Sequence, residues 1–405
     1  MNRSLENISD GAFRAAFVLF ALFAPFSIAG MNFALGLAAL AWVLYIIDRR
    51  GARVRPDGLA LASIALALCA LPSVLLSENL PRALNDWRSY WELAICFLVG
   101  AHIARVRARS VSFWTMSAAA AGACLVAFVQ RAGGIDAGPI HIGAAHRVGG
   151  TMFTMTFAGI LYQLILFTAA AALAPKMARQ RRWLALVVAM EFVALLFTMT
   201  RGAWVALFAG AAMLCLVMRR RVLLAGSALA LVVALVFSFA FARDQGRTIA
   251  VTELATRPAD RNVATRLVLW QISWELFRAH PLFGVGMGDY TIEADKHLRQ
   301  RQVRTTVDTH NVYLHLLATR GLVGFIPFVV YLVVLLRSLA RVYARAGPGS
   351  IDRYYAAGAI AVVVAIMAGA LTENNIDDSE VNMVMMFLVG IARSPLARES
   401  PRSNG

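Results

Sequence analysis

The sequence predicts an all-α, polytopic membrane protein, and three observations support this fold class. Of the 405 residues, 60% are hydrophobic and only 15% are charged, and the mean hydropathy is +0.66. The apolar residues fall in blocks of about 20 residues, the length at which a helix crosses a hydrocarbon core of ~30 Å. Basic residues lie mainly between these blocks. A soluble enzyme, a collagen-like chain and a disordered chain are therefore excluded.

Twelve membrane spans are predicted from the apolar blocks. Their approximate bounds are 13–29, 31–47, 58–76, 89–104, 111–129, 151–173, 183–199, 202–218, 222–242, 321–339, 354–372 and 380–394. Residues 1–12 lack the pattern of a cleaved signal peptide, so we expect the first span to be retained. We expect residues 1–405 to form a single integral membrane domain.

Basic residues are distributed unevenly between the loops. The loops after even-numbered spans contain 21 arginines and lysines, whereas the short odd-numbered loops contain only Arg82, Arg88, Arg131, Arg147 and Arg201. Because cytoplasmic loops are enriched in lysine and arginine, both termini are predicted to lie in the cytoplasm. The net charge of +16 therefore reflects membrane topology and does not indicate a nucleic-acid partner.

Polar groups within the spans are few. The four cysteines lie in apolar blocks without CxxC spacing, so we expect packing residues rather than disulfides or a zinc site. Glu191 is the one acidic residue deep within a span, where a charge costs about 2.5–3.5 kcal/mol. We interpret it as hydrogen-bonded between helices; the alternative is a proton or substrate path, for which more than one acid is expected.

One loop, residues 243–320 on the predicted periplasmic face, interrupts the pattern of short connections. Loops of this length are more often functional than idle. A helix along the membrane surface is predicted over 262–279, ended by His280-Pro281. A second helix over 308–319 is too short to span the membrane, so it is predicted to be re-entrant or interfacial.

Chemistry on the periplasmic face has no ATP available, and the sequence has no GxxxxGK[ST] loop. The substrate must therefore arrive already activated, and a sugar on a polyprenyl pyrophosphate is the main candidate in a bacterial envelope. Arginines near the membrane surface suit its diphosphate, and the candidates are Arg147, Arg201, Arg261 and Arg266. Each is alternatively an interfacial anchor or a member of a loop ion pair.

His310 lies where the long loop re-enters the membrane, at the predicted level of Arg201. Histidine is suited to proton transfer near neutral pH. The alternative is a structural histidine held by Asp308 or by a backbone carbonyl. No cofactor is predicted: the sequence has no HExxH helix of the kind that binds zinc, and the lack of a paired-carboxylate signature in the loop is compatible with chemistry that needs no metal.

Three motifs in order resemble the O-antigen ligase family, whose superfamily also contains O-antigen polymerases and protein oligosaccharyltransferases. The motifs are Thr200-Arg201-Gly202-Ala203, then Arg266 and Trp270 with His280-Pro281-Leu-Phe-Gly284-Val-Gly286, then His310-Asn311-Val-Tyr313-Leu314 with Gly321-Leu-Val-Gly324. The family usually carries an acidic residue shortly before the last Gly-x-x-Gly, where this chain has Thr319-Arg320. Asp308 then becomes the candidate that orients His310.

The resemblance implies a GT-C-like glycosyltransferase fold and an inverting, metal-independent transfer. The donor would be undecaprenyl pyrophosphate bearing O-antigen polysaccharide and the acceptor a hydroxyl of the lipid A-core, both among membrane lipids. Arg201 and Arg266 would bind the pyrophosphate, and His310 would accept the acceptor's proton or instead bind the diphosphate as an imidazolium. The further candidate substrate-binding residues are Arg147, Arg261, Trp270, Tyr313 and Asp308.

Three other functions stay open on these motifs. An O-antigen polymerase would use a second polyprenyl-linked glycan as acceptor, and a protein O-oligosaccharyltransferase would use serine or threonine. A lipid-linked sugar transporter would place charges across the depth of the bilayer, whereas here they gather near the two faces. The charge pattern therefore favours chemistry at the surface over translocation.

Overall fold

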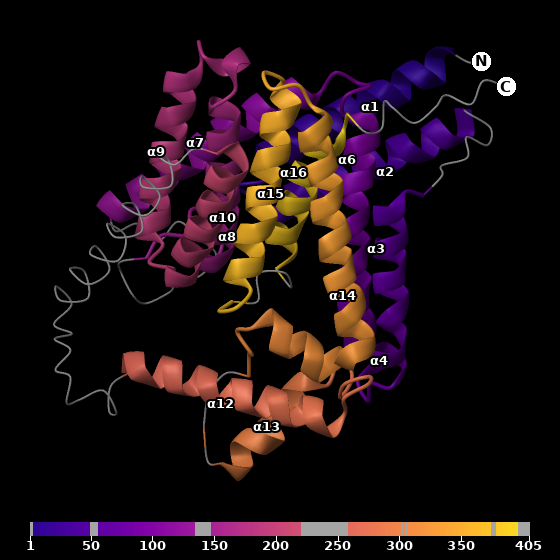
Figure 1. The fold of residues 1–405 in the computed structure, drawn as a ribbon, viewed down its shortest axis with the longest axis vertical. Coiled ribbons are helices and arrows are strands. Elements are labelled where there is room, and N and C mark those ends of the chain that lie inside the picture. The colour runs from indigo at the N-terminus through magenta and orange to yellow at the C-terminus, as the bar shows by residue number, and fades with distance from the viewer. Residues whose placement is uncertain are drawn as a thin grey trace.

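The computed structural model describes residues 3–48, 56–133, 147–219, 258–301, 303, 307–373 and 378–395, without the side chains of 3–5 and 258–264. Every regular element in this part of the chain is a helix, which confirms the predicted class (Figure 1). The elements in chain order are α1 (Arg3–Phe23), α2 (Ile28–Asp48), α3 (Gly58–Cys69), α4 (Leu71–Leu75), α5 (Leu80–Arg88), η1 (Ser89–Leu93), α6 (Ala94–His102), α7 (Arg109–Gly133), α8 (Thr154–Ala172), η2 (Pro175–Met177), α9 (Arg181–Phe197), α10 (Arg201–Met218), α12 (Pro258–Ala279), α13 (Tyr290–Gln300), α14 (Val312–Arg345), α15 (Ile351–Gly369) and α16 (Ser379–Arg393).

The described helices agree with the predicted spans to different degrees. Seven of them are long and apolar enough to cross a membrane, with α3 and α4 acting as one. These are 28–48, 58–75, 109–133, 154–172, 201–218, 312–345 and 351–369. Other predicted spans coincide with α1, with η1 and α6, with α9 and with α16, which fall outside this set. The predicted span 222–242 lies outside the described residues, so a multi-pass protein is confirmed and the number twelve stays a prediction.

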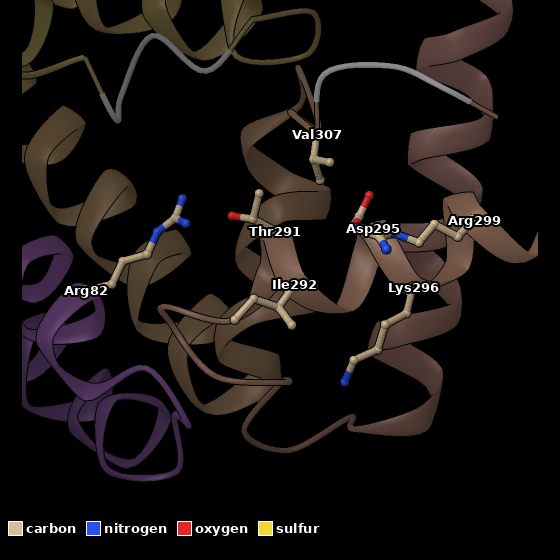
Figure 2. A pocket seen from close by; sticks show the side chains of 7 residues that line it. All are labelled: Arg82, Thr291, Ile292, Asp295, Lys296, Arg299 and Val307. Carbon is tan, nitrogen blue, oxygen red and sulfur yellow. Dashed lines mark hydrogen bonds and ion pairs between the residues drawn. The ribbon is translucent and has the colours of Figure 1, made fainter.

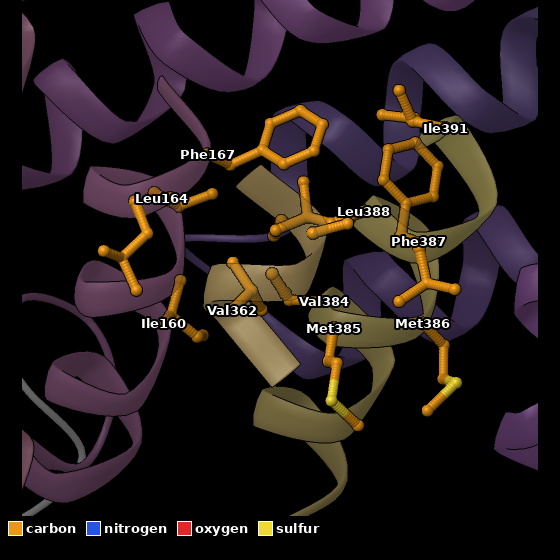
Figure 3. Packing of buried hydrophobic residues seen from close by; sticks show 14 of the residues in the cluster. Ile160, Leu164, Phe167, Val362, Val384, Met385, Met386, Phe387, Leu388 and Ile391 are labelled. Atoms are coloured by element: carbon orange, nitrogen blue, oxygen red, sulfur yellow. The ribbon is translucent and has the colours of Figure 1, made fainter. Parts of the chain in front are cut away.

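The core of the bundle is built where α8, α15 and α16 meet. Almost every residue of α8 is buried, and its Ile160, Leu164 and Phe167 face side chains of α15 and α16 (Figure 3). Small residues let neighbouring helices of the bundle, such as α10 and α15, approach each other closely. A Cβ at Gly210 of α10 would lie 2.8 Å from the carbonyl oxygen of Ala361 in α15. Close backbone approach of this kind is typical of helices that pack within a membrane.

Ion pairs join the helices at one end of the bundle. Arg105 pairs with Asp10 at 2.6 Å and Arg109 with Asp352 at 2.5 Å, and Arg393 pairs with Asp57. All three arginines belong to the loops that the charge distribution predicts to be cytoplasmic. The ion pairs therefore gather those loops on one side, as the predicted topology requires.

The opposite end of the bundle carries the helices of the long loop. Figure 1 shows α12 and α13 lying crosswise below the bundle. The predicted surface helix 262–279 is confirmed as a helix by α12 (Pro258–Ala279). The predicted short helix begins at Val312, capped by Asn311, and is the first part of α14, which breaks at Gly321 with φ 59° and ψ −162°. The break separates a short crosswise helix from the long part of α14, as the sequence predicted.

Two glycine-containing segments pair with each other at this break. Leu322 and Val323 donate their N–H groups to the carbonyls of Pro281 and Leu282 at 2.9 and 3.0 Å. Gly321 has the backbone angles that only glycine adopts readily, and a Cβ there would lie 2.4 Å from the carbonyl carbon of Leu282. The segment after α12 and the start of the long part of α14 therefore form one unit.

Glu191 does not fit its predicted role. Its side chain is fully buried in α9, and neither carboxylate oxygen has a hydrogen-bond partner among the described residues. The predicted interhelical hydrogen bond is therefore wrong for the described part of the chain. Periodicity placed Glu191 inside a span, but whether a donor faces it depends on how the helices are rotated against one another. The cysteines were predicted to be packing residues, and Cys96, Cys124 and Cys215 are indeed buried, whereas Cys69 is half-buried.

Substitution of Gly321 by alanine should destabilise the protein. A non-glycine residue in this backbone region costs about 1–3 kcal/mol, and the new Cβ would overlap the Leu282 backbone. We expect Gly321→Ala to lower the melting temperature of the purified protein, measured in detergent. Gly347→Ala is the matched control, because a Cβ at Gly347 meets no atom within 4 Å. Equal melting temperatures for the two variants would contradict this account.

Candidate functional site

The carboxylate of Glu373 lies at the centre of the candidate site. Glu373 follows α15, and its side chain is 9% exposed. One carboxylate oxygen accepts a hydrogen bond from Nη2 of Arg266 at 3.0 Å. The other lies 3.5 Å from Nδ1 of His310. Two of the three residues predicted to be catalytic therefore meet at one acidic group.

His310 is held at this point by its neighbours in sequence. Its φ of 48° is left-handed, a conformation that a non-glycine residue keeps only where its surroundings impose it. Asp308 accepts a hydrogen bond from the His310 N–H at 3.1 Å. Next to it, Val312 donates its N–H to the carbonyl of Ala370 at 2.9 Å, and the Asn311 amide donates to that of Leu371. These bonds align the His310 segment with the turn that carries Glu373.

Asp308 contributes a second carboxylate to His310. Its Oδ2 lies 3.6 Å from His310 Nδ1, and the side chain is 43% exposed. The prediction that Asp308 substitutes for the missing family acid is therefore incomplete, because the more buried Glu373 also faces Nδ1. Thr319 and Arg320 stand where the family carries its acidic residue, and both form other hydrogen bonds. Thr319 Oγ1 donates to the carbonyl of His315, and Arg320 donates to the Tyr90 hydroxyl.

Trp270 lies one helical turn after Arg266 on α12. Its indole N–H donates to the carbonyl of Thr309 at 3.0 Å, directly before His310. The sequence suggested that Trp270 binds substrate, but the polar atom of this side chain is engaged with the backbone. Its place in the structure is that of a residue that positions the His310 segment against α12.

Arg201 is the first residue of α10, and its side chain is exposed. Among the described residues it has no side-chain hydrogen bond or ion pair. The next residue explains how the start of α10 approaches the site: a Cβ at Gly202 would lie 3.1 Å from Cγ of Glu373 and 2.8 Å from Oγ1 of Thr372. A side chain at this position would require Thr372 and Glu373 to shift. The first turn of α10 therefore lies against Glu373, and the exposed Arg201 at its start has no ionic partner among the described residues.

Arg147 braces the turn that precedes Arg201. Its Nε donates to the carbonyl of Thr198 at 2.9 Å and its Nη2 to Oγ1 of Thr200 at 3.1 Å. Burial lowers the pKa of Arg147, and the negative charge of Glu373 opposes that shift. The sequence suggested that Arg147 binds substrate; in the structure its guanidinium holds the backbone next to Arg201.

The remaining predicted residues are placed as follows. The Tyr313 hydroxyl donates to the carbonyl of Met367 at 2.7 Å, so this side chain fastens α14 to α15. The side chain of Arg261 lies outside the described residues. No group of three or more histidine, cysteine, aspartate or glutamate side chains in the described part of the chain is placed to hold a metal ion.

The electrostatics of the site favour an ionised Glu373. Burial alone would raise the pKa of Glu373, but the hydrogen bond from His310 and the charge and hydrogen bond of Arg266 outweigh it. The pKa of Glu373 therefore lies below its ordinary value of 4.5. With Nδ1 of His310 directed at two carboxylates, a neutral imidazole keeps its proton on Nδ1 and leaves Nε2 as the basic atom. This arrangement is suited to accepting a proton from a hydroxyl group.

Sequence reasoning did not identify Glu373. It belongs to an acidic loop, 373–380, between the last two predicted spans. The available signal was an acid at the end of a span, on the predicted face of Arg201 and His310. No short motif marks it, because its partners are far away in the sequence.

Comparison with known proteins supports the family resemblance. Residues 184–329 match the family described as O-antigen ligase, which confirms the resemblance predicted from the motifs. The matched stretch contains Arg201, Arg266 and His310, whereas Glu373 and Arg147 lie outside it. No curated protein matches the chain.

Replacement of Glu373 by glutamine should reduce stability in a pH-dependent way. A carboxylate whose pKa is lowered in the folded state stabilises the protein above pH 4.5, and this contribution is lost as the pH falls further towards the folded-state pKa. We therefore expect Glu373→Gln to lower the free energy of unfolding at pH 7 by roughly 1–3 kcal/mol relative to the wild type. This difference in free energy should narrow below pH 4.5.

The control for this measurement is Glu275→Gln. Glu275 pairs with Arg301 at 2.6 Å in a partly exposed ion pair. Exposed pairs contribute about 0–1 kcal/mol, so this variant should melt close to the wild type. A difference between wild type and Glu373→Gln that is independent of pH would contradict the role given to the Glu373 charge.

Proposed function

We propose that this chain, whose residues 184–329 match the O-antigen ligase family, transfers O-antigen polysaccharide from undecaprenyl pyrophosphate to a hydroxyl of the lipid A-core. The enzyme would be a glycosyltransferase of GT-C type in the bacterial inner membrane, with both termini cytoplasmic and the site facing the periplasm. The observation that carries the proposal is the Glu373 carboxylate, which joins Arg266 to His310 beside the start of α10.

The donor diphosphate would bind to arginines. Arg201 is exposed and without an ionic partner among the described residues. Arg266 uses Nη2 for Glu373, and the side chain is 30% exposed, which leaves further N–H donors for a phosphate. Both charges would stabilise the negative charge that develops on the leaving pyrophosphate as the anomeric carbon–oxygen bond breaks. Losing one donor of this kind typically costs about 10²–10³ in rate.

His310 would act on the acceptor. Its Nε2 would accept the proton of the attacking hydroxyl while Glu373 and Asp308 hold Nδ1 and stabilise the imidazolium that forms. The acceptor oxygen forms the new bond to the anomeric carbon from the side opposite the pyrophosphate, so the configuration is inverted. Undecaprenyl pyrophosphate leaves with the electrons of the broken bond and needs no general acid.

The acceptor distinguishes an O-antigen ligase from the other enzymes of the superfamily. An O-antigen polymerase or a protein O-oligosaccharyltransferase would use the same donor and the same arginines. No contact of the described residues selects between these acceptors. Reconstitution of the purified protein with polyprenyl-linked polysaccharide and either lipid A-core or a serine-containing peptide, followed by mass analysis of the product, would identify the acceptor. A lipid-linked sugar transporter would yield no covalent product in this assay.

Alanine at His310 should abolish most of the transfer. We expect His310→Ala to lower the rate by about 10²–10⁴ while donor lipid still binds, because the base is lost and the arginines remain. His297→Ala on α13 is the control, since His297 lies 3.7 Å from Glu275 rather than at the site. Loss of donor binding by His310→Ala would instead assign His310 to the diphosphate.

The arginine variants test the donor site. Arg201→Ala and Arg266→Ala should each reduce transfer by about 10²–10³ and weaken binding of the donor lipid. Arg278→Ala is the control for both, because Arg278 is an exposed arginine in the last turn of α12. Full transfer by Arg201→Ala would remove the first-named residue from the mechanism.

Transfer should continue in the presence of a chelator. Arginines take the part that a divalent cation plays in other phosphate-binding sites, so we expect an unchanged rate in EDTA. The measurement is the initial rate of transfer before and after dialysis against EDTA. A rate that falls in EDTA and returns with Mg²⁺ or Mn²⁺ would contradict metal-independent transfer.

A further inference from the structure

An open cavity of about 500 Å³ lies between α5 and α13, outside the residues discussed above. Figure 2 shows Arg82 reaching towards it from one side, α13 side chains on the other, and Val307 above them. Its lining residues are Arg82, Thr291, Ile292, Asp295, Lys296, Arg299 and Val307. The volume is within the range of about 300–1,000 Å³ that small-molecule sites occupy.

The two walls of this cavity are fixed relative to each other. The buried carboxylate of Asp289 precedes α13 and accepts hydrogen bonds from the Ser77 hydroxyl and from the backbone N–H groups of Glu78 and Asn79. Asn79 is the N-cap of α5. The adjacent Gly288 lets α5 approach, since a Cβ there would lie 2.8 Å from the Asn79 carbonyl oxygen. Two helices that are joined where both begin therefore form the walls of the open cavity.

The lining combines aligned polar groups with aliphatic surface. Arg299 donates from Nε to Asp295 at 2.7 Å, so the pair presents both a donor and an acceptor in a set orientation. Ile292 is 41% exposed and provides aliphatic surface, as does Val307. A sugar ring also combines polar and apolar surface, with hydroxyl groups at its edge and apolar C–H groups on its faces. The lining therefore suits a carbohydrate.

Arg82 adds an unused charge to the cavity. Its side chain is exposed and has no hydrogen bond or ion pair with any residue that the structure describes. The other two cations of the lining are engaged: Arg299 with Asp295, and Lys296 with Glu293 at 2.6 Å. A free guanidinium recognises carboxylate and phosphate groups in a bidentate manner. Arg82 thus suits an acidic substituent on the sugar.

The cavity lies beside the proposed reaction centre. Val307 directly precedes Asp308, whose carboxylate faces His310. At the start of α13, the Tyr290 hydroxyl shares a hydrogen bond of 2.8 Å with Ser273 of α12, the helix that carries Arg266. The cavity therefore adjoins the segment that carries Asp308 and His310.

We propose that the cavity between α5 and α13 binds a short segment of a substrate glycan, with an acidic substituent of one sugar at Arg82. This subsite rests on the proposed function and deepens it, because it selects which glycans reach His310. The segment belongs either to the polyprenyl-linked donor or to the lipid-linked acceptor. Both offer the same chemistry, and the experiment separates them.

The test measures binding and transfer separately on the full-length protein in lipid nanodiscs. The probes are the core oligosaccharide and the O-polysaccharide released by mild acid from lipopolysaccharide of the bacterium that encodes the chain. The variants are Arg82→Gln, which removes the free charge, and Ile292→Trp, which fills the cavity. Arg88→Gln is the matched control, because Arg88 lies on the same helix, bonds Asn85 and does not line the cavity.

We expect both cavity variants to weaken binding of one probe roughly tenfold or more, the usual effect of losing a hydrogen bond to a charged group. The KM of the corresponding substrate should rise by a similar factor with kcat little changed, and Arg88→Gln should match the wild type. Weaker binding of the O-polysaccharide assigns the subsite to the donor, and weaker binding of the core oligosaccharide assigns it to the acceptor.

Two results separate the subsite from the proposed function. If the wild type transfers glycan but both variants keep wild-type KM values and probe binding, the subsite is refuted and the proposed function stands. If the wild type forms no product but binds a probe in a manner that requires Arg82, the subsite stands and the ligase function is refuted.

Discussion

The negative charge of Glu373 is the constraint on which the candidate site depends. It bonds Arg266 of α12 and faces His310 ahead of α14, and it comes from the turn after α15. The start of α10 lies against it because Gly202 leaves no side chain between them. Four segments that are distant in the sequence thus meet at one buried carboxylate, whose pKa stays low because His310 and Arg266 donate hydrogen bonds to it and Arg266 adds a positive charge.

The backbone pairing between 281–286 and 318–323 gives this meeting point a rigid base. Val285 and Gly286 donate their N–H groups to the carbonyls of Ala318 and Thr319, and Thr319 also accepts from the Ser73 hydroxyl. The glycine-rich segment after α12 therefore allows close backbone packing and does not form a phosphate-binding loop. Asp289 extends the same unit to α5, because its carboxylate accepts hydrogen bonds from the segment between α4 and α5.

The predicted site residues divide into two groups by what their polar atoms contact. Arg147, Trp270 and Tyr313 use them on backbone carbonyls, which fixes the positions of neighbouring segments. Arg201 has no ionic partner among the described residues, and Arg266 and His310 share Glu373. We assign substrate chemistry to this second group, because a diphosphate and a hydroxyl need groups that remain accessible.

The sequence alone determined the helical class, most of the helix positions, the break at Gly321 and the three motifs, because each depends on residues close together in the chain. Hydrophobic blocks set the spans, and glycine and proline set the ends of the loop helices. Only the tertiary structure revealed Glu373 as the partner of Arg266 and His310, the burial of Glu191 without a hydrogen-bond partner among the described residues, and the cavity between α5 and α13. These features depend on how the helices rotate and pack against one another. The spacing of apolar residues shows which side of a helix is buried, but it does not show which side chain of a second helix lies opposite.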